Sequence, residues 1–237
     1  MSYSPSDILK NYWLEELGCS ETDLHSKKTV VRSHGTLSGY PGIMVFKRED
    51  TCLISAPGGL VEGIENSFHQ MSAEAAFDPL VFQSFLGDKF EKVVGPAWLG
   101  QITPENYLQC HDENVRELSA WESFEEFLLA CPTDEVELSS LQTRRPPVKA
   151  VFQNEKIVTA AGFELMEKVV AHIGILTHPA FRGRGYAKQA ISAIVETIFQ
   201  MKLGPQYWTH ENNLPSIRAA SDIGFNKFAA TLAIRIR

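Results

Sequence analysis

One segment constrains the fold of this chain more than any other. Residues 172–177 form an apolar run that Pro179 closes, and a turn at 182–187 then reads Arg-Gly-Arg-Gly-Tyr-Ala. Apolar residues recur at helical spacing from Lys188 to Met201. This order predicts a buried strand that passes through a glycine turn directly into a helix, and therefore an α/β fold.

The turn has the features of a phosphate site. The first amides of a helix have no partner within the helix, and the helix dipole favours an anion there. Gly183 and Gly185 would let the backbone approach a ligand closely, and Arg182, Arg184 and Lys188 add positive charge. A plain strand-to-helix turn with solvated arginines is the alternative.

Two familiar nucleotide motifs do not fit this turn. No Gly-Lys-Ser/Thr follows it, so it is not a Walker loop. The dinucleotide fingerprint Gly-x-Gly-x-x-Gly is incomplete, because Lys188 stands where the third glycine belongs.

Two motifs, in the right order, resemble those of the GNAT N-acetyltransferase superfamily. Residues 177–187 are similar to its acetyl-CoA signature, in which a strand and a proline precede Arg/Gln-x-x-Gly-x-Gly/Ala at the start of a helix. Asn213 then begins a segment that ends in Gly224-Phe225, similar to the closing motif Asn-x-x-Ala/Ser, helix, Gly-Phe. The resemblance covers about the last half of the chain, and it concerns the fold and the cofactor rather than the acceptor.

The resemblance implies a site for acetyl-CoA along these motifs. The strands around Thr177 and Tyr207 would splay into a V-shaped cleft, and Asn213 would help to position the cofactor. The acyl and pantetheine arm would lie on the backbone of Ile175, Leu176 and Thr177, and the pyrophosphate on the amides of Arg182, Gly183, Arg184, Gly185, Tyr186 and Ala187. An acceptor amine would attack the acetyl carbonyl directly, with a backbone amide stabilising the oxyanion.

The acid and the base are where the sequence departs from the family pattern. Many members carry a tyrosine seven residues after the closing asparagine, which is Ala220 here, and some carry a glutamate five residues before it, which is Trp208. By local position, the candidate catalytic residues are Glu164, His172 and His210, and a histidine titrates near a suitable pH.

The sequence is compatible with three functions. The first is an acetyl-CoA-dependent N-acetyltransferase. The missing tyrosine also allows a non-catalytic acyl-CoA-binding regulator or sensor, and a structural module with an empty glycine turn is the third.

Composition narrows the partners. The chain of 237 residues is 44% hydrophobic, and its net charge of −7 argues against nucleic-acid binding while mildly favouring an amine acceptor, a small molecule or a peptide. The sequence has no cysteine or histidine pair with metal-ligand spacing, no apolar run long enough for a membrane span and no signal-peptide pattern. We therefore expect a cytoplasmic protein with reduced thiols and without a metal or a membrane partner, and we keep a homodimer open.

Two regions are expected along the chain, 1–112 and 113–237. The first would be an N-terminal α/β region, either a degenerate GNAT-like half or a lid, with helices over 6–17, 60–71 and 79–86 and strands over 29–32, 43–47, 52–55 and 92–103, the last interrupted at Gly95-Pro96. The second would be the GNAT acetyl-CoA-binding catalytic domain, a mixed, mostly antiparallel sheet flanked by helices. Its expected elements are a strand over 114–118, a helix over 121–130 capped by Ser119, a polar loop over 139–147, a hairpin over 148–165, strands over 171–177, 206–210 and 228–236, and helices over 187–201 and 215–223.

Overall fold

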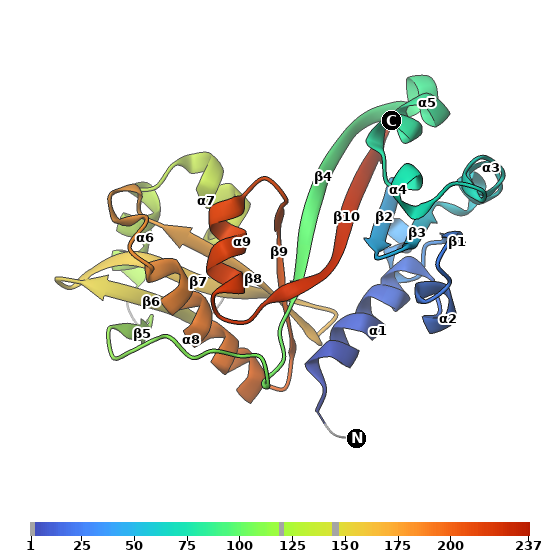
Figure 1. Ribbon diagram of the computed structural model, residues 1–237. Coiled ribbons are helices and arrows are strands. Elements are labelled where there is room, and N and C mark those ends of the chain that lie inside the picture. The colour runs from blue at the N-terminus through green and yellow to red at the C-terminus, as the bar shows by residue number, and fades with distance from the viewer. Residues whose placement is uncertain (1–2, 119–120, 144–146) are drawn as a thin grey trace. The chain divides into compact units, whose positions relative to one another are not determined.

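The computed structural model describes residues 3–118, 121–143 and 147–237, and these form two compact units (Figure 1). Unit 1 comprises the chain up to Leu9 together with Gly100–Trp208 and Asn213–Asn226. Unit 2 comprises Lys10–Leu99, Thr209–Asn212 and Lys227–Arg237. The units thus combine stretches that are distant in sequence, and the expected division of roles between 1–112 and 113–237 stays a prediction.

Unit 2 is built on a sheet with strand order β1-β3-β2-β10-β4. Strand β1 runs parallel to β3, whereas β2 is antiparallel to both β3 and β10. The strands are β1 (Thr29–Ser33), β2 (Ile43–Arg48), β3 (Thr51–Ala56), β4 (Phe90–Gln101) and β10 (Asn226–Ile236). Strand β4 is continuous, so the interruption expected at Gly95-Pro96 is wrong, although that peptide bond is cis.

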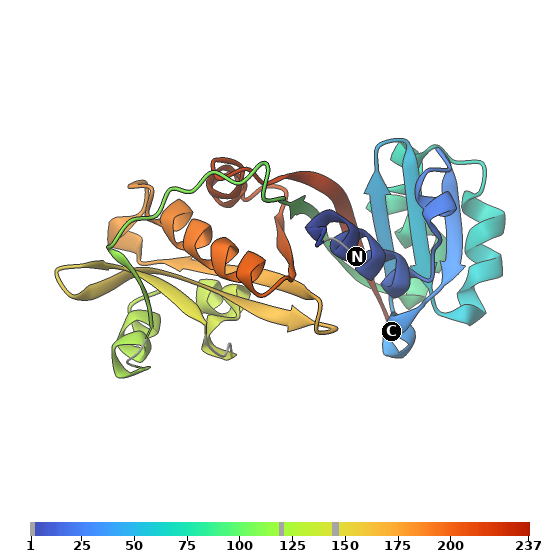
Figure 2. The ribbon, with the colours of Figure 1, turned by 90° about the horizontal axis from the view of Figure 1, so that it is seen from below.

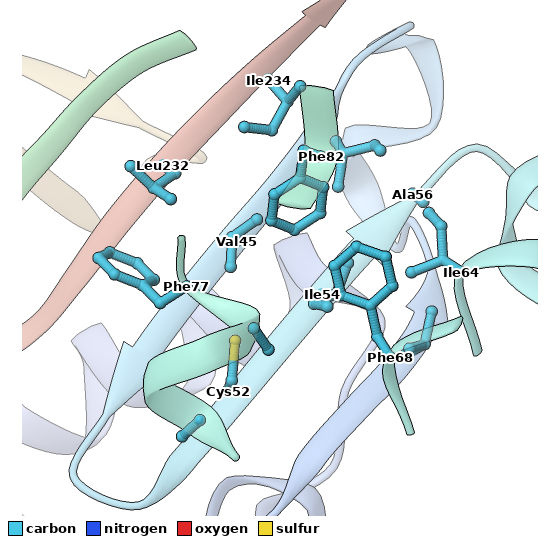
Figure 3. Close-up of a cluster of buried hydrophobic side chains, with 14 of the residues drawn as sticks. Val45, Cys52, Ile54, Ala56, Ile64, Phe68, Phe77, Phe82, Leu232 and Ile234 are labelled. Carbon is cyan, nitrogen blue, oxygen red and sulfur yellow. The ribbon is translucent and has the colours of Figure 1, made fainter. Parts of the chain in front are cut away.

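The helices of the N-terminal half are α1 (Pro5–Leu17), α2 (Glu21–Leu24), α3 (Gly58–Phe68), α4 (Ala73–Ala76) and α5 (Pro79–Leu86). Local chemistry sets several of their ends: the Asp78 side chain accepts a hydrogen bond from the Leu80 amide at the start of α5, and Gly18 follows α1 with a φ of 65°. Side chains of α3 and α5 pack on the sheet, and Figure 3 shows Ile64, Phe68 and Phe82 among them. The fully buried core there includes Val45, Ile54, Ile64, Phe68, Phe82, Leu232 and Ile234.

Unit 1 is built on strands in the order β9-β8-β7-β6-β5. Strands β5 to β8 pair antiparallel with one another, and β8 and β9 are parallel. The strands are β5 (Val115–Glu117), β6 (Val148–Gln153), β7 (Lys156–Met166), β8 (Val170–Thr177) and β9 (Gly204–His210). The mixed, mostly antiparallel sheet expected from the sequence is confirmed.

Helices cover both faces of the strands of unit 1. They are α6 (Trp121–Leu129), α7 (Thr133–Ser139), α8 (Tyr186–Gln200) and α9 (Leu214–Ser221). Helix α8 lies against β6, β7 and β8 on one face, and α6 and α7 lie on the other, where α6 contacts β7 and α7 contacts β8 (Figure 2). No helix in the described part of the chain is long and apolar enough to cross a membrane.

Helix α7 was not predicted from the sequence, and neither were the single-turn helices α2 and α4. Helix α7 spans only two turns, too short for a clear periodic pattern, and a 3₁₀ turn (Leu141–Thr143) follows within the expected polar loop. Asp134 and Glu135 occupy its first turn, where the helix dipole favours negative charge. The expected cap of α6 by Ser119 lies outside the described residues.

Candidate active site

The glycine turn is an open cradle of backbone. Strand β8 leads into it through a 3₁₀ turn (Pro179–Phe181), and α8 begins directly after it. Gly183 and Gly185 have φ values of 74° and 81°, in the left-handed region that disfavours other residues. Apart from Gly183 and its two chain neighbours, no described residue has a heavy atom within 4 Å of the position that a Cβ on Gly183 would take. A ligand can therefore approach the main chain at this point without meeting a side chain.

The N-terminus of α8 leaves donors available to such a ligand. Gly185 is the N-cap, makes no side-chain capping bond, and precedes a helix of 15 residues whose first turn contains no acidic residue. The first amides of the helix consequently lack both an intrahelical acceptor and a capping side chain. Together with the helix dipole, this donor set fits a phosphate or pyrophosphate group.

The two arginines of the turn differ in their surroundings. The Arg184 guanidinium lies over the Phe181 ring, 5.4 Å from its centroid. Arg182 instead donates from Nε to the Thr177 carbonyl (3.3 Å) and from its terminal nitrogen to Oε2 of Glu135 on α7 (2.5 Å). Glu135 was not predicted as part of the site, because nothing in the sequence indicates that α7 lies beside the turn.

Strands β8 and β9 separate beside the turn. Their parallel pairing covers Val170–His172 and Gly204–Gln206, whereas β8 continues to Thr177 and stays paired with β7 along that length. Between His172 and the end of β8, no pairing with β9 occurs in the described chain, so peptide groups on that edge are available to a ligand. Ile175, Leu176 and Thr177 lie in this stretch. The Leu176 side chain is buried in the core under α6 and α7, which leaves its backbone as the part that a ligand can meet.

Two of the three candidate catalytic residues lie together where the strands part. Glu164 on β7 is the register partner of His172, and His172 is the register partner of Gln206 on β9. The three side chains therefore form a row on one face of the sheet. Trp208, two residues beyond Gln206, presents its ring edge-on to His172 with centroids 6.1 Å apart.

The same face carries the core under α6 and α7. Ala160 and Leu176 are register partners, belong to that core, and lie four residues along their strands from Glu164 and His172, hence on the same face. Glu164 is exposed and His172 is half-buried. An imidazole in this position can accept a proton. The carboxylate and the aromatic ring beside it can attract a cation.

His210, the third candidate, has a different setting. It is exposed near the end of β9, it belongs to unit 2, and its ring Nδ1 accepts a hydrogen bond from the Asn212 amide (3.1 Å). This bond caps a turn, which is a structural role.

The closing motif provides a helix cap and no proton donor at the usual position. The Asn213 side chain accepts from the Ser216 amide (3.3 Å) at the start of α9. Ala220 is fully buried. Tyr207, which the sequence did not single out as catalytic, contacts Ser216 Oγ through its hydroxyl at 2.8 Å. Because burial raises the pKa of Tyr207 to about 12, its phenol is a weak proton donor.

The described residues contain no cluster of three or more His, Cys, Asp or Glu side chains that could hold a metal ion.

Comparisons with known proteins concern the family and the fold. The model of the acetyltransferase (GNAT) family matches residues 108–225. A search of curated proteins gives no match. Among solved structures, the GCN5-related N-acetyltransferase from Kribbella flavida superposes with a TM-score of 0.54 at 15% identity, covering 82% of this chain and 86% of that one.

An acetyltransferase from the GNAT family of Colwellia psychrerythraea superposes with a TM-score of 0.51 at 16% identity. The match covers 67% of this chain and 62% of that one, so this chain spans less than two thirds of the Colwellia protein. At such identities, the structural likeness speaks for the fold alone.

Proposed function

Because residues 108–225 form an acetyltransferase domain of the GNAT family, we propose that the protein transfers an acetyl group from acetyl-CoA to an amine of a small molecule or peptide. The observation that carries the proposal is the backbone cradle of Gly183 and Gly185 at the N-terminus of α8, next to a strand edge without a partner strand. The first element would bind a pyrophosphate and the second an extended arm, and coenzyme A contains both groups.

Each part of the donor has residues to hold it. The amides from Arg182 to Ala187 would bind the pyrophosphate, with Arg184 adding charge. The backbone of Ile175, Leu176 and Thr177 would bind the pantetheine arm, and Asn213 at the start of α9 would help to position it. Bound in this way, acetyl-CoA supplies an activated thioester close to the point where β8 and β9 separate.

His172 is the base in this proposal. The acceptor arrives as an ammonium ion, and it must lose a proton before its nitrogen can attack. His172 takes that proton, the neutral nitrogen attacks the acetyl carbonyl, and the C–S bond breaks once the C–N bond has formed. The second proton of the nitrogen passes through water to the departing thiolate. Glu164, opposite His172 on β7, attracts the ammonium ion and stabilises the protonated imidazole. Orientation of the two substrates supplies several kcal/mol of the barrier reduction.

A second candidate function, an acyl-CoA-binding regulator, is favoured by the buried Ala220 at the position of the usual proton donor. Release of free thiol from acetyl-CoA in the presence of a panel of amines separates the two functions. Amine-dependent release supports the transferase, whereas tight acetyl-CoA binding without release for any amine supports the regulator.

A further inference from the structure

One side chain ties three elements of unit 1 together. Arg182 bonds to the carbonyl of Thr177 at the end of β8 and to Glu135 on α7, while its own backbone is part of the glycine turn. Both partners of the ion pair are partly exposed, with 45% and 38% of their side-chain surface accessible. Exposed ion pairs contribute little to stability, so a role in holding the fold together is a poor explanation for this pair.

Cys131 lies near both Arg182 and Glu135. This thiol lies just before α7 and is buried, which raises its pKa to about 11. The positive charge of Arg182 lowers that pKa and the negative charge of Glu135 raises it, so both charges lie near this thiol. Helix α7 in turn packs on β8, on the face that carries Leu176 and His172.

Arg182 can serve an anion and Glu135 at the same time. A guanidinium has five N–H donors in a planar fork, and the bonds to Thr177 and Glu135 use two of them. A phosphate group on the turn can therefore bond to Arg182 without displacing Glu135. Immobilising the turn then also immobilises the carboxylate that Arg182 holds, and with it α7.

We propose that Glu135 is a positioning residue that transmits cofactor binding from the glycine turn to α7, and so orders the face on which the acceptor reacts. The proposal rests on the proposed function, since it takes coenzyme A as the ligand of the turn. The coupling arises because the ion pair makes the ordered state of α7 more favourable when the turn is filled.

Hydrogen exchange with and without coenzyme A tests this coupling in the full-length protein. Three proteins are compared: the native chain, Glu135→Gln, and Glu137→Gln as a matched control on an exposed residue of the same helix. We expect coenzyme A to slow exchange in peptides covering 183–189 in all three. In peptides covering 133–139, exchange should slow about threefold in the native chain and in Glu137→Gln, and not in Glu135→Gln.

A charge-preserving variant separates the ion pair from other effects on the helix. Glu135→Asp should recover part of the slowing at 133–139, since it keeps a carboxylate within reach of Arg182. Equal slowing of 133–139 in Glu135→Gln and the native chain would overturn the coupling, as would faster exchange there on binding. If coenzyme A slows 183–189 in none of the proteins, the cofactor site itself is wrong and the coupling falls with it.

Discussion

The neighbours of His172 favour a role in proton transfer. His172 stands at the last pair between β8 and β9, opposite Glu164 on one side and Gln206 on the other, with the Trp208 ring beside it. The sequence placed His172 and Glu164 on neighbouring strands, and only the register shows that they are opposite each other. His210 has the same side chain and a different environment, since its ring caps a turn.

This contrast gives the first prediction. His172→Gln should lower the rate of acetyl transfer by about 100-fold, because the ammonium of the acceptor then has no base, while coenzyme A binding is retained. The measurement is initial rate against amine concentration, with binding followed by calorimetry. His210→Gln is the control and should keep most of the activity. Similar losses in both variants would remove His172 from its assigned role.

Ala220 illustrates the limit of counting along a motif. The sequence shows that the usual tyrosine is missing, and the structure adds that the position is fully buried. A tyrosine introduced there would overpack the interior, at a cost of about 1–3 kcal/mol or more. Restoring the family pattern at this position is thus a change to the core as well as to the chemistry.

At the level of elements, helix α8 also holds a neighbouring segment of the chain in place, in addition to the role of its N-terminus. Its residue Ser192 is fully buried and fastens the segment between β4 and β5. The Ser192 hydroxyl lies 2.9 Å from the Tyr107 hydroxyl, accepts a bond from the Cys110 amide at 3.0 Å, and lies 3.0 Å from Nδ1 of His111. His111 in turn lies 3.0 Å from Glu196, one helical turn further along α8.

The second prediction follows from these contacts. Ser192→Ala should lower the free energy of unfolding by about 1–3 kcal/mol, because the half-buried Cys110 amide loses its acceptor and the Tyr107 hydroxyl and His111 lose a partner. Urea unfolding measures the loss. Ser221→Ala, on the exposed surface of α9, should change stability by no more than about 0.5 kcal/mol. A neutral Ser192→Ala would mean that this segment is held in place by other contacts.

Most elements were predictable because their signals are local. Periodicity indicated α1, α5 and α8, the Asp78–Pro79 pair marked the start of α5, and the Asn154-Glu155 turn has the positive φ values of a tight hairpin (49° and 60°). Helix α7 was missed because two turns carry too little pattern. The Glu135–Arg182 pair was missed for a different reason, since it joins residues that only the folded chain brings together.

At the level of the whole molecule, the sequence could not show which segments of the chain make up each of the two units. The C-terminal strand β10 pairs with β2, almost two hundred residues earlier, and contributes Leu232 and Ile234 to the core with α3 and α5. Local patterns identify a strand but do not name its partner. The chain thus leaves unit 2 near the end of β4, re-enters it at Thr209–Asn212 and returns to it again with β10.

The third prediction uses this return. Leu232→Ala should destabilise unit 2 by about 2–5 kcal/mol, because it leaves a cavity in a fully buried core. Hydrogen exchange should then speed up in peptides covering 43–56, although these are distant in sequence. Leu165→Ala, at an exposed position of β7, is the control and should have little effect there. Unchanged exchange over 43–56 in Leu232→Ala would contradict the assignment of β10 to this core.

The glycine turn is assigned as the site of the acetyl-CoA pyrophosphate, and calorimetry with acetyl-CoA tests this assignment most directly. The native protein should bind acetyl-CoA, and Gly185→Val should bind it at least about tenfold more weakly, a loss of about 1.4 kcal/mol, with the fold retained by circular dichroism. Gly185→Asn is the matched control, since asparagine tolerates the left-handed backbone better than valine and should lose less affinity. An unchanged dissociation constant in Gly185→Val, or no binding to the native protein at millimolar acetyl-CoA, would contradict the account.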